Sequence, residues 1–239
     1  MNRYEGKVCL VTGGTAGIGY ATAERMALEG GFVVICSRQV KNVEKAVETL
    51  RHKIGNGKGT VDGLVVNVGK SADRAKLVDF IKNKFGKLDV LVLNAAAGTH
   101  YGKQLDISEK AYDRMWDVNV KSTFFLIKES KPLMDLAGKG KNILIVSSVT
   151  GKNPQELLGV YAMTKGALDN MCIWLHKELM PDGIRVNGIA PGLILTNFSV
   201  KLQEDTNRPK EAEGRAHQIG SVAATICSDD GSFMNGEVY

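Results

Sequence analysis

The sequence has few cysteines, and no two of them are close together. They are Cys9, Cys36, Cys172 and Cys227. Each lies in an apolar segment, and none forms a Cys-x-x-Cys motif. This distribution predicts buried, reduced thiols. Because such thiols persist in reducing compartments, we expect an intracellular protein.

Long apolar runs, basic runs and metal-ligand spacings are missing as well. No apolar stretch approaches the roughly 18–20 residues of a membrane-spanning helix. Residues 1–7 are polar and lead directly into a predicted strand, which is not the pattern of a secretory signal. The net charge of +5 includes no run of Lys or Arg, so we expect an anionic ligand rather than nucleic acid. No spacing of His, Cys, Asp or Glu indicates a metal site.

The sequence does contain a regular alternation of short apolar segments and helical patterns. Strands are predicted at 7–12, 32–37, 64–68, 90–94, 142–148 and 185–190, and the start of a last strand at 237–239. Helices are predicted at 18–29, 40–53, 71–85, 161–179 and 216–228, with one or two more across 108–136. Apolar strands that each precede a helix indicate a parallel sheet covered on both faces. We therefore expect an α/β Rossmann fold in which one domain, residues 1–239, contains a doubly wound seven-stranded parallel sheet.

A glycine-rich loop follows the first predicted strand. Its candidate cofactor-binding residues are Gly13, Thr15, Gly17, Ile18 and Gly19. Glycines allow a tight turn and a close approach of the backbone to phosphate, and the next helix offers free N–H groups. A purely structural turn is the alternative. The position between the first strand and the first helix favours dinucleotide binding.

The spacing of these glycines resembles the Thr-Gly-x-x-x-Gly-x-Gly motif of the short-chain dehydrogenase/reductase family. The resemblance runs along nearly the whole chain. The stretch Asn94-Ala95-Ala96-Ala97 resembles the Asn-Ala-Gly motif of that family, with Ala96 in place of glycine. A carbonyl-reductase subgroup, dehydrogenase/reductase member 4, also has alanine there. Asn94 and Ala95 are therefore expected to lie against the cofactor.

The residues after the second and third strands indicate which cofactor is used. An acidic residue after the second strand would bind the ribose diol of NAD, whereas this chain has Ser37 and Arg38. A hydroxyl and a guanidinium accept a 2′-phosphate, so we expect NADP(H), unless Arg38 is only a solvated surface residue. Asn67 and Val68 follow the third strand, where the family usually has an acidic residue facing the adenine. The amide oxygen of Asn67 can still accept that bond.

Tyr161 and Lys165 are four residues apart on a predicted helix and therefore share one face. Alone, such a pair would usually be solvated. Ser148 ends the fifth strand, with its neighbour Ser147 as the alternative, and Asn119 lies in the preceding helical region. These residues match the Asn-Ser-Tyr-Lys catalytic tetrad of the family.

The residue types suit carbonyl reduction. A tyrosine has a pKa near 10, and an adjacent ammonium favours its phenolate, so we expect Lys165 to lower the pKa of Tyr161. Ser148 would donate to the substrate oxygen. The resemblance implies that Asn119 holds a water beside Lys165. It also implies that the segment after the sixth strand surrounds the nicotinamide through Pro191, Gly192 and Ile194, and that Thr196 reaches the pyrophosphate. Thr196 is equally compatible with an N-cap.

The expected substrate is a small carbonyl or alcohol. Specificity is assigned to residues 98–101, residues 153–159 and the segment after Pro191, with an apolar wall from Leu157, Leu158 and Phe198. His100 could bind substrate, but a surface position is favoured. The resemblance implies an NADPH-dependent reductase of ketones, aldehydes or retinoids. A 3-oxoacyl-thioester reductase and a non-catalytic nucleotide-binding regulator are the alternatives.

The resemblance also implies a homodimer or homotetramer. Two helices show more apolar surface than one core face requires, through Trp116, Phe124, Phe125, Met171 and Trp174. Ordinary core packing is the alternative. A substrate lid is expected near residues 193–218. The chain stops at residues 236–239, where the family continues through a last strand, so both a cytoplasmic and a peroxisomal location agree with the sequence.

Overall fold

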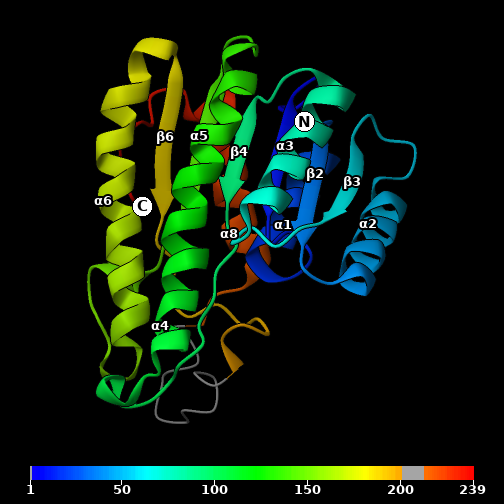
Figure 1. Ribbon diagram of the computed structural model, residues 1–239. Helices are drawn as coiled ribbons and strands as arrows, with labels where there is room; N and C mark the ends of the chain where they lie inside the picture. Colours follow the sequence, from blue (N-terminus) through cyan, green and yellow to red (C-terminus); the bar gives the residue numbers. More distant parts are fainter. Residues whose placement is uncertain (1, 201–212) are drawn as a thin grey trace.

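The computed structural model describes residues 2–200 and 213–239, and strands and helices alternate along the chain (Figure 1). The strands are β1 (Val8–Thr12), β2 (Phe32–Ser37), β3 (Thr60–Val65), β4 (Val90–Leu93), β5 (Lys141–Val146) and β6 (Ile184–Ile189). The helices are α1 (Gly17–Leu28), α2 (Val40–Ile54), α3 (Ser71–Phe85), α4 (Glu109–Trp116), α5 (Ser122–Asp135), α6 (Gly159–Leu179) and α8 (Ala216–Cys227). None of these helices is both long and apolar enough to cross a membrane.

The six strands form one parallel sheet in the order β3-β2-β1-β4-β5-β6, which confirms the doubly wound Rossmann prediction. The order reverses between β1 and β4, and ligands of such sheets bind at this switch point. The expected seventh strand is shorter than predicted. Val238 forms a single parallel bridge with Gly188 of β6, flanked by backbone hydrogen bonds of Glu237 and Tyr239.

The third strand also begins earlier than the predicted 64–68. β3 pairs with β2 from Phe32↔Thr60 to Ser37↔Val65. β3 lies at the edge of the sheet, where Asp62 and Gly63 are only partly buried. An edge strand can contain such residues, and for this reason the start of β3 has no continuous apolar run that would have revealed it. The apolar residues that follow Val65 belong to the connection that leads into α3.

Helices cover both faces of the sheet: α3, α5 and α6 lie on one, and α1, α2 and α8 lie on the other (Figure 1). The alternation of side chains along each strand separates two apolar layers. On β1, Leu10 packs toward the first group of helices and Val11 toward the second. All four cysteines are buried with free thiols, as their apolar surroundings predicted.

The predicted helical region 108–136 is a nearly continuous helix with one wide turn. A π-turn at Asp117–Lys121 joins α4 to α5. Such turns widen the helix and are frequent at functional sites. The hydroxyls of Ser122 and Thr123 donate to the carbonyls of Val118 and Asn119 at 2.6 and 2.7 Å. These bonds satisfy carbonyl groups at the wide turn, so the irregularity is stable.

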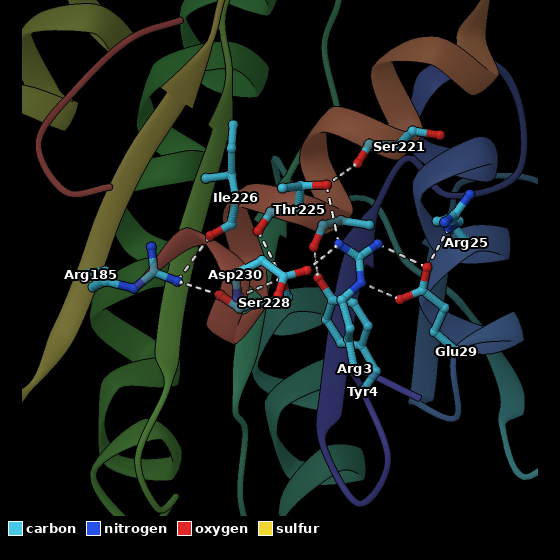
Figure 2. Close-up of polar contacts among 11 residues, drawn as sticks. Arg3, Tyr4, Arg25, Glu29, Arg185, Ser221, Thr225, Ile226, Ser228 and Asp230 are labelled. Atoms are coloured by element: carbon cyan, nitrogen blue, oxygen red, sulfur yellow. Dashed lines mark hydrogen bonds and ion pairs between the residues drawn. The ribbon is translucent and has the colours of Figure 1, made fainter. Parts of the chain in front are cut away.

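A polar network ties the N-terminal segment to α1 and α8 (Figure 2). Arg3 lies between Glu29, at 2.5 Å, and Asp230, at 3.0 Å. Arg25 forms a second ion pair with Glu29. Arg185 of β6 donates to the carbonyl oxygens of Ile226 and Ser228 at the end of α8, where cations are favoured by the helix dipole.

Candidate active site

A cavity of about 360 Å³ lies at the carboxyl ends of the strands, at the topological switch point. It brings together most of the residues that the sequence predicted. Its wall includes Gly13, Gly17, Ile18, Ser37, Arg38, Asn67, Val68, Asn94, Ala95, Ser148, Tyr161, Lys165, Pro191, Gly192, Ile194 and Thr196. Three predicted residues, Thr15, Gly19 and Asn119, are not part of this wall.

The glycine loop presents backbone rather than side chains to the cavity. Gly13 and Gly17 adopt left-handed conformations with φ of 63° and 56°, which other residues rarely adopt. Helix α1 begins at Gly17, and its N-cap residue Ala16 has no side chain that could cap it. The first N–H groups of the helix therefore lie in the cavity wall without a side-chain partner from the cap, which is a typical arrangement for binding an anion.

Gly19 serves the packing of this loop instead of lining the cavity. A Cβ at this position would lie 2.3 Å from Nδ2 of Asn94. That amide donates to the carbonyl oxygens of Thr12 and Gly13 at 3.0 and 3.2 Å. The Asn94 side chain thus joins the end of β4 to the glycine loop, and only Gly19 leaves it enough room.

At the end of β2, Ser37 and Arg38 lie in the cavity wall, as predicted. Arg38 is exposed and forms no hydrogen bond or ion pair among the residues that the structure describes. Asn67 has a second role that the sequence did not indicate, because its Oδ1 accepts the backbone N–H of Gly69 at 3.2 Å. An amide oxygen has two lone pairs, so one acceptor site of Asn67 remains.

Tyr161 lies at the start of α6, with its ring 5.9 Å from the ring of Phe198. Burial raises the pKa of Tyr161 well above its ordinary value, and hydrogen bonding to Ser148 opposes this rise. The net shift is therefore upward, opposite to the lowering that the sequence predicted, because burial disfavours the phenolate. Tyr161 consequently keeps its proton at neutral pH.

Ser148 is the second residue after β5, and its hydrogen bond to Tyr161 favours it over Ser147. Its Oγ accepts hydrogen bonds from the backbone N–H and the hydroxyl of Thr150, at 3.2 and 3.0 Å. Ser147 instead donates to the carbonyl oxygen of Lys165 at 3.2 Å and so holds the helix. Because Thr150 donates to Ser148, the hydroxyl proton of Ser148 is left for another acceptor.

Lys165 is almost completely buried at the floor of the cavity. Its Nζ donates to the carbonyl oxygen of Val146, the last residue of β5, at 2.8 Å. Burial lowers the pKa of Lys165 to about 8, while the carboxylate of Asp169 acts in the opposite direction. Asp169 follows one helical turn later and was not recognised in the sequence. The lysine is therefore close to losing its proton near neutral pH.

Asn119 lies in the π-turn, behind the cavity wall. Its Oδ1 accepts the N–H of Ala97 at 2.7 Å, and its Nδ2 donates to the carbonyl of Ala97 and to Oγ1 of Thr164 at 3.1 and 2.9 Å. The side chain thus connects the loop after β4 to helix α6. Both hydrogens of Nδ2 are occupied, so the Asn119 amide could offer the predicted water beside Lys165 only the second lone pair of Oδ1.

Gln104 is a further residue that the sequence did not reveal. Its Oε1 accepts the N–H of Val160 at 2.8 Å, and its Nε2 donates to the carbonyls of Gly102 and Leu157 at 2.7 and 2.8 Å. Helix α6 has no side-chain cap from its own N-cap residue Leu158. Gln104 supplies this cap from 56 positions away, and no local pattern could indicate such a contact.

The segment after β6 closes one side of the cavity. Pro191, Gly192, Ile194 and Thr196 all lie in the wall, and Ile194 forms a parallel bridge with Gly214. The predicted lid, residues 193–218, is described only in part, because residues 201–212 lie outside the described residues. Phe198 places an apolar ring beside Tyr161, as expected for a substrate wall. Leu158 also lines the cavity, whereas Leu157 does not.

Comparison with known proteins agrees with this fold. The model of the short chain dehydrogenase family matches residues 7–207. The chain therefore belongs to the short-chain dehydrogenase/reductase family, which consists of oxidoreductases that use a nicotinamide cofactor.

Two curated relatives illustrate the similarity. Tropinone reductase-like 3 from Erythroxylum coca is 39% identical over 98% of this chain and 91% of its own length. Dehydrogenase/reductase SDR family member 4 from Sus scrofa is 40% identical over 98% of this chain and 85% of its own length.

Two solved structures are similar over almost the entire chain. A short chain dehydrogenase from Burkholderia cenocepacia in complex with NADP has a TM-score of 0.88 at 26% identity, covering 99% of this chain and 96% of its own. L-sorbose reductase from Gluconobacter frateurii, complexed with NADPH and L-sorbose, has a TM-score of 0.91 at 28% identity, covering 100% and 96%.

Proposed function

We propose that this protein is an NADP(H)-dependent carbonyl reductase that converts a ketone or aldehyde into an alcohol. The observation that carries the proposal is the meeting of Tyr161, Ser148 and Lys165 in one cavity. The same cavity contains a helix N-terminus without a side-chain cap and Arg38, which has no partner among the described residues. The residues fit a dinucleotide phosphate, since the glycine loop leaves room for it and two cationic features attract it.

The phosphate groups and the adenosine would be held at the end of the cavity nearest β1 and β2. The N–H groups at Gly17 and Ile18 suit the pyrophosphate, while Ser37 and Arg38 suit a 2′-phosphate. Thr196 lies against Gly17 and therefore also suits the pyrophosphate, while Ile194 suits the nicotinamide end. The two structural relatives that are bound to NADP and NADPH support this choice of cofactor.

The bound nicotinamide supplies the hydride of the reduction. Tyr161 donates a proton to the carbonyl oxygen, and the raised pKa of its buried hydroxyl keeps that proton available at neutral pH. Ser148 donates its hydroxyl proton to the same oxygen and stabilises the negative charge that develops there. The ammonium of Lys165 stabilises the phenolate that forms when Tyr161 gives up its proton. The apolar ring of Phe198 excludes water from one side of Tyr161.

The test is NADPH oxidation with a panel of ketones, aldehydes, dicarbonyls and 3-oxoacyl thioesters. Turnover of simple carbonyls is expected, and Tyr161→Phe should abolish turnover while NADPH binding, followed by fluorescence, survives. Turnover restricted to 3-oxoacyl thioesters would favour the reductase of that class. NADPH binding without turnover of any substrate in the panel would instead favour a nucleotide-binding regulator.

We also propose that the chain forms a homodimer or homotetramer through α5 and α6. Phe124 and Trp174 remain partly exposed, and their rings lie 6.4 Å apart across the two helices. Met171, in contrast, is buried in the core, so only part of the apolar surplus is available for contact between copies. Sedimentation of the wild-type protein and of Trp174→Asp tests the proposal, because the variant should dissociate.

A further inference from the structure

Arg114 of α4 lies in the wall of the cavity, and its role follows neither from the catalytic tetrad nor from the glycine loop. It precedes Val118 by one helical turn, and both residues line the same side of the cavity. Its Nη1 lies 3.5 Å from the position that a Cβ of Gly69 would occupy, and Oδ1 of Asn67 lies 3.4 Å from the same position. The guanidinium is therefore close to the end of β3.

This guanidinium has no partner within residues 2–200 and 213–239. Among the residues that the structure describes, it forms no hydrogen bond and no ion pair. The neighbouring Arg74 differs, since it is paired with Glu129 and donates to the carbonyl of Val68 at 2.9 Å. Arg114 is thus a half-buried cation in the wall of the cavity.

The surroundings explain why Arg114 stays unpaired. Residue 67 is the neutral Asn67, and its Oδ1 already accepts the N–H of Gly69. The carboxylate of Asp73 accepts the backbone N–H of Asn67 at 2.9 Å and is therefore not paired with Arg114. An acidic side chain at position 67 would be close enough to attract Arg114. The neutral amide leaves the guanidinium free for a ligand.

The position of Arg114 indicates which part of a dinucleotide it would contact. Arg38 follows β2, where the ribose of a dinucleotide lies, whereas Arg114 approaches from the side of β3 and α4. Asn67, Val68 and Val118 line this part of the cavity, and the two valines give it an apolar surface. A flat guanidinium at its edge can stack on a nucleobase and hydrogen-bond to its ring nitrogens.

We propose that Arg114 binds the adenine ring of the cofactor, separately from the recognition of the 2′-phosphate by Arg38. This inference rests on the proposed function only in requiring an adenine dinucleotide in the cavity. Because the adenine is common to all such ligands, Arg114 contributes equally to binding with and without the 2′-phosphate.

The test measures the binding of 5′-AMP and of adenosine 2′,5′-bisphosphate by calorimetry or by displacement of fluorescent NADPH. Arg114→Met should weaken both by a similar factor, roughly 3- to 30-fold as expected for loss of a cation–π contact. Arg38→Met should weaken only the bisphosphate. Arg114→Lys should recover little, because a point charge does not replace the planar stack.

Lys110→Met is the matched control, since Lys110 is exposed on the same helix and does not line the cavity. It should bind both nucleotides like the wild type. Thermal unfolding of each variant checks that the fold is intact.

Wild-type affinity of Arg114→Met for both nucleotides would overturn the assignment, and loss of binding for the bisphosphate alone would make Arg114 a phosphate ligand instead. A wild-type protein that binds neither nucleotide would overturn it as well. A protein that binds 5′-AMP but reduces no carbonyl would refute the proposed function and leave this assignment standing.

Discussion

The ammonium nitrogen of Lys165 lies 5.4 Å from the centre of the Tyr161 ring. The cation is fixed there by its hydrogen bond to the carbonyl of Val146. It therefore lies over the face of the ring instead of bonding to the hydroxyl. In the proposed mechanism this cation would stabilise negative charge on the phenolate, while the hydroxyl of Tyr161 is left to bond to Ser148 and to the substrate.

The protonation of Lys165 should limit the proposed activity at alkaline pH. Because burial lowers the pKa of Lys165 to about 8, the ammonium is present below this pH and is lost above it. The phenolate then loses its stabilising cation, so kcat/KM for NADPH should decline as pH rises through about 8. An NMR titration of the Lys165 side chain in the free protein should show the same midpoint. A midpoint near the ordinary lysine value would contradict this origin.

Asp169→Asn should move that alkaline limb toward lower pH. The carboxylate of Asp169 raises the pKa of Lys165 against the effect of burial, and its removal leaves burial unopposed. At pH 7 the variant should therefore retain less activity than at pH 6. Asp135→Asn, a surface substitution on α5, is the control and should keep the wild-type profile. An unchanged profile in Asp169→Asn would show that the carboxylate acts only in packing against Gly151.

Arg38→Asp should reverse the preference between NADPH and NADH. The substitution removes the cation proposed for the 2′-phosphate and places a negative charge in its position. Charge-assisted hydrogen bonds contribute about 1.5–3 kcal/mol, so the affinity for NADPH should fall by roughly 10- to 100-fold. The affinity for NADH should stay the same or improve. The measurement is the ratio of the dissociation constants for NADPH and NADH in the wild type and the variant. An unchanged ratio would show that Arg38 is only a solvated surface residue.

Gln104→Glu should perturb substrate binding more than cofactor binding. The carboxylate can still accept the N–H of Val160, but it cannot donate to the carbonyls of Gly102 and Leu157. Facing these carbonyls, it should separate the two loops that flank the cavity. We expect KM for the carbonyl substrate to rise about 10-fold, in line with the loss of one or two hydrogen bonds. Asn83→Asp, at an exposed position of α3 outside the cavity wall, is the control for an added negative charge. An equal rise in Kd for NADPH would indicate general unfolding of the site.

Glu29→Gln should destabilise the fold at neutral pH by about 3 kcal/mol, because it leaves Arg3 and Arg25 without their charged partner. Burial alone would raise the pKa of Glu29, but the hydrogen bonds from Arg3 and Arg25 hold it below its ordinary value. The stabilisation is therefore complete above the ordinary pKa of Glu and is lost as pH falls through the lowered one.

Urea unfolding of both proteins between pH 3 and pH 7 tests this, and the difference between them should shrink toward acid. Glu24→Gln removes the more exposed pair with Lys53 and should cost only about 0.5 kcal/mol. If both variants lost the same stability, the network in Figure 2 would have no special role.

The sequence by itself determined the order of strands and helices and most of the residues that line the cavity. Apolar runs fix buried parallel strands, and in such a sheet the residues that follow each strand meet at one edge. For this reason Gly13, Arg38 and Ser148 could be assigned to one site from their positions, and Tyr161 joined them through its match to the catalytic tetrad of the family. The glycine spacing and the four-residue step from Tyr161 to Lys165 are local patterns, which one sequence displays in full.

Only the tertiary structure decided what these residues touch. Gln104 caps helix α6 at a residue 56 positions away, and the amide group of Asn119 is hydrogen-bonded to the backbone of Ala97. Arg114 lies beside Gly69 and has no partner among the described residues. Burial also reversed the expected direction of the Tyr161 pKa. Contacts between distant segments and the loss of solvent arise from packing in three dimensions, and no local spacing of residues encodes them.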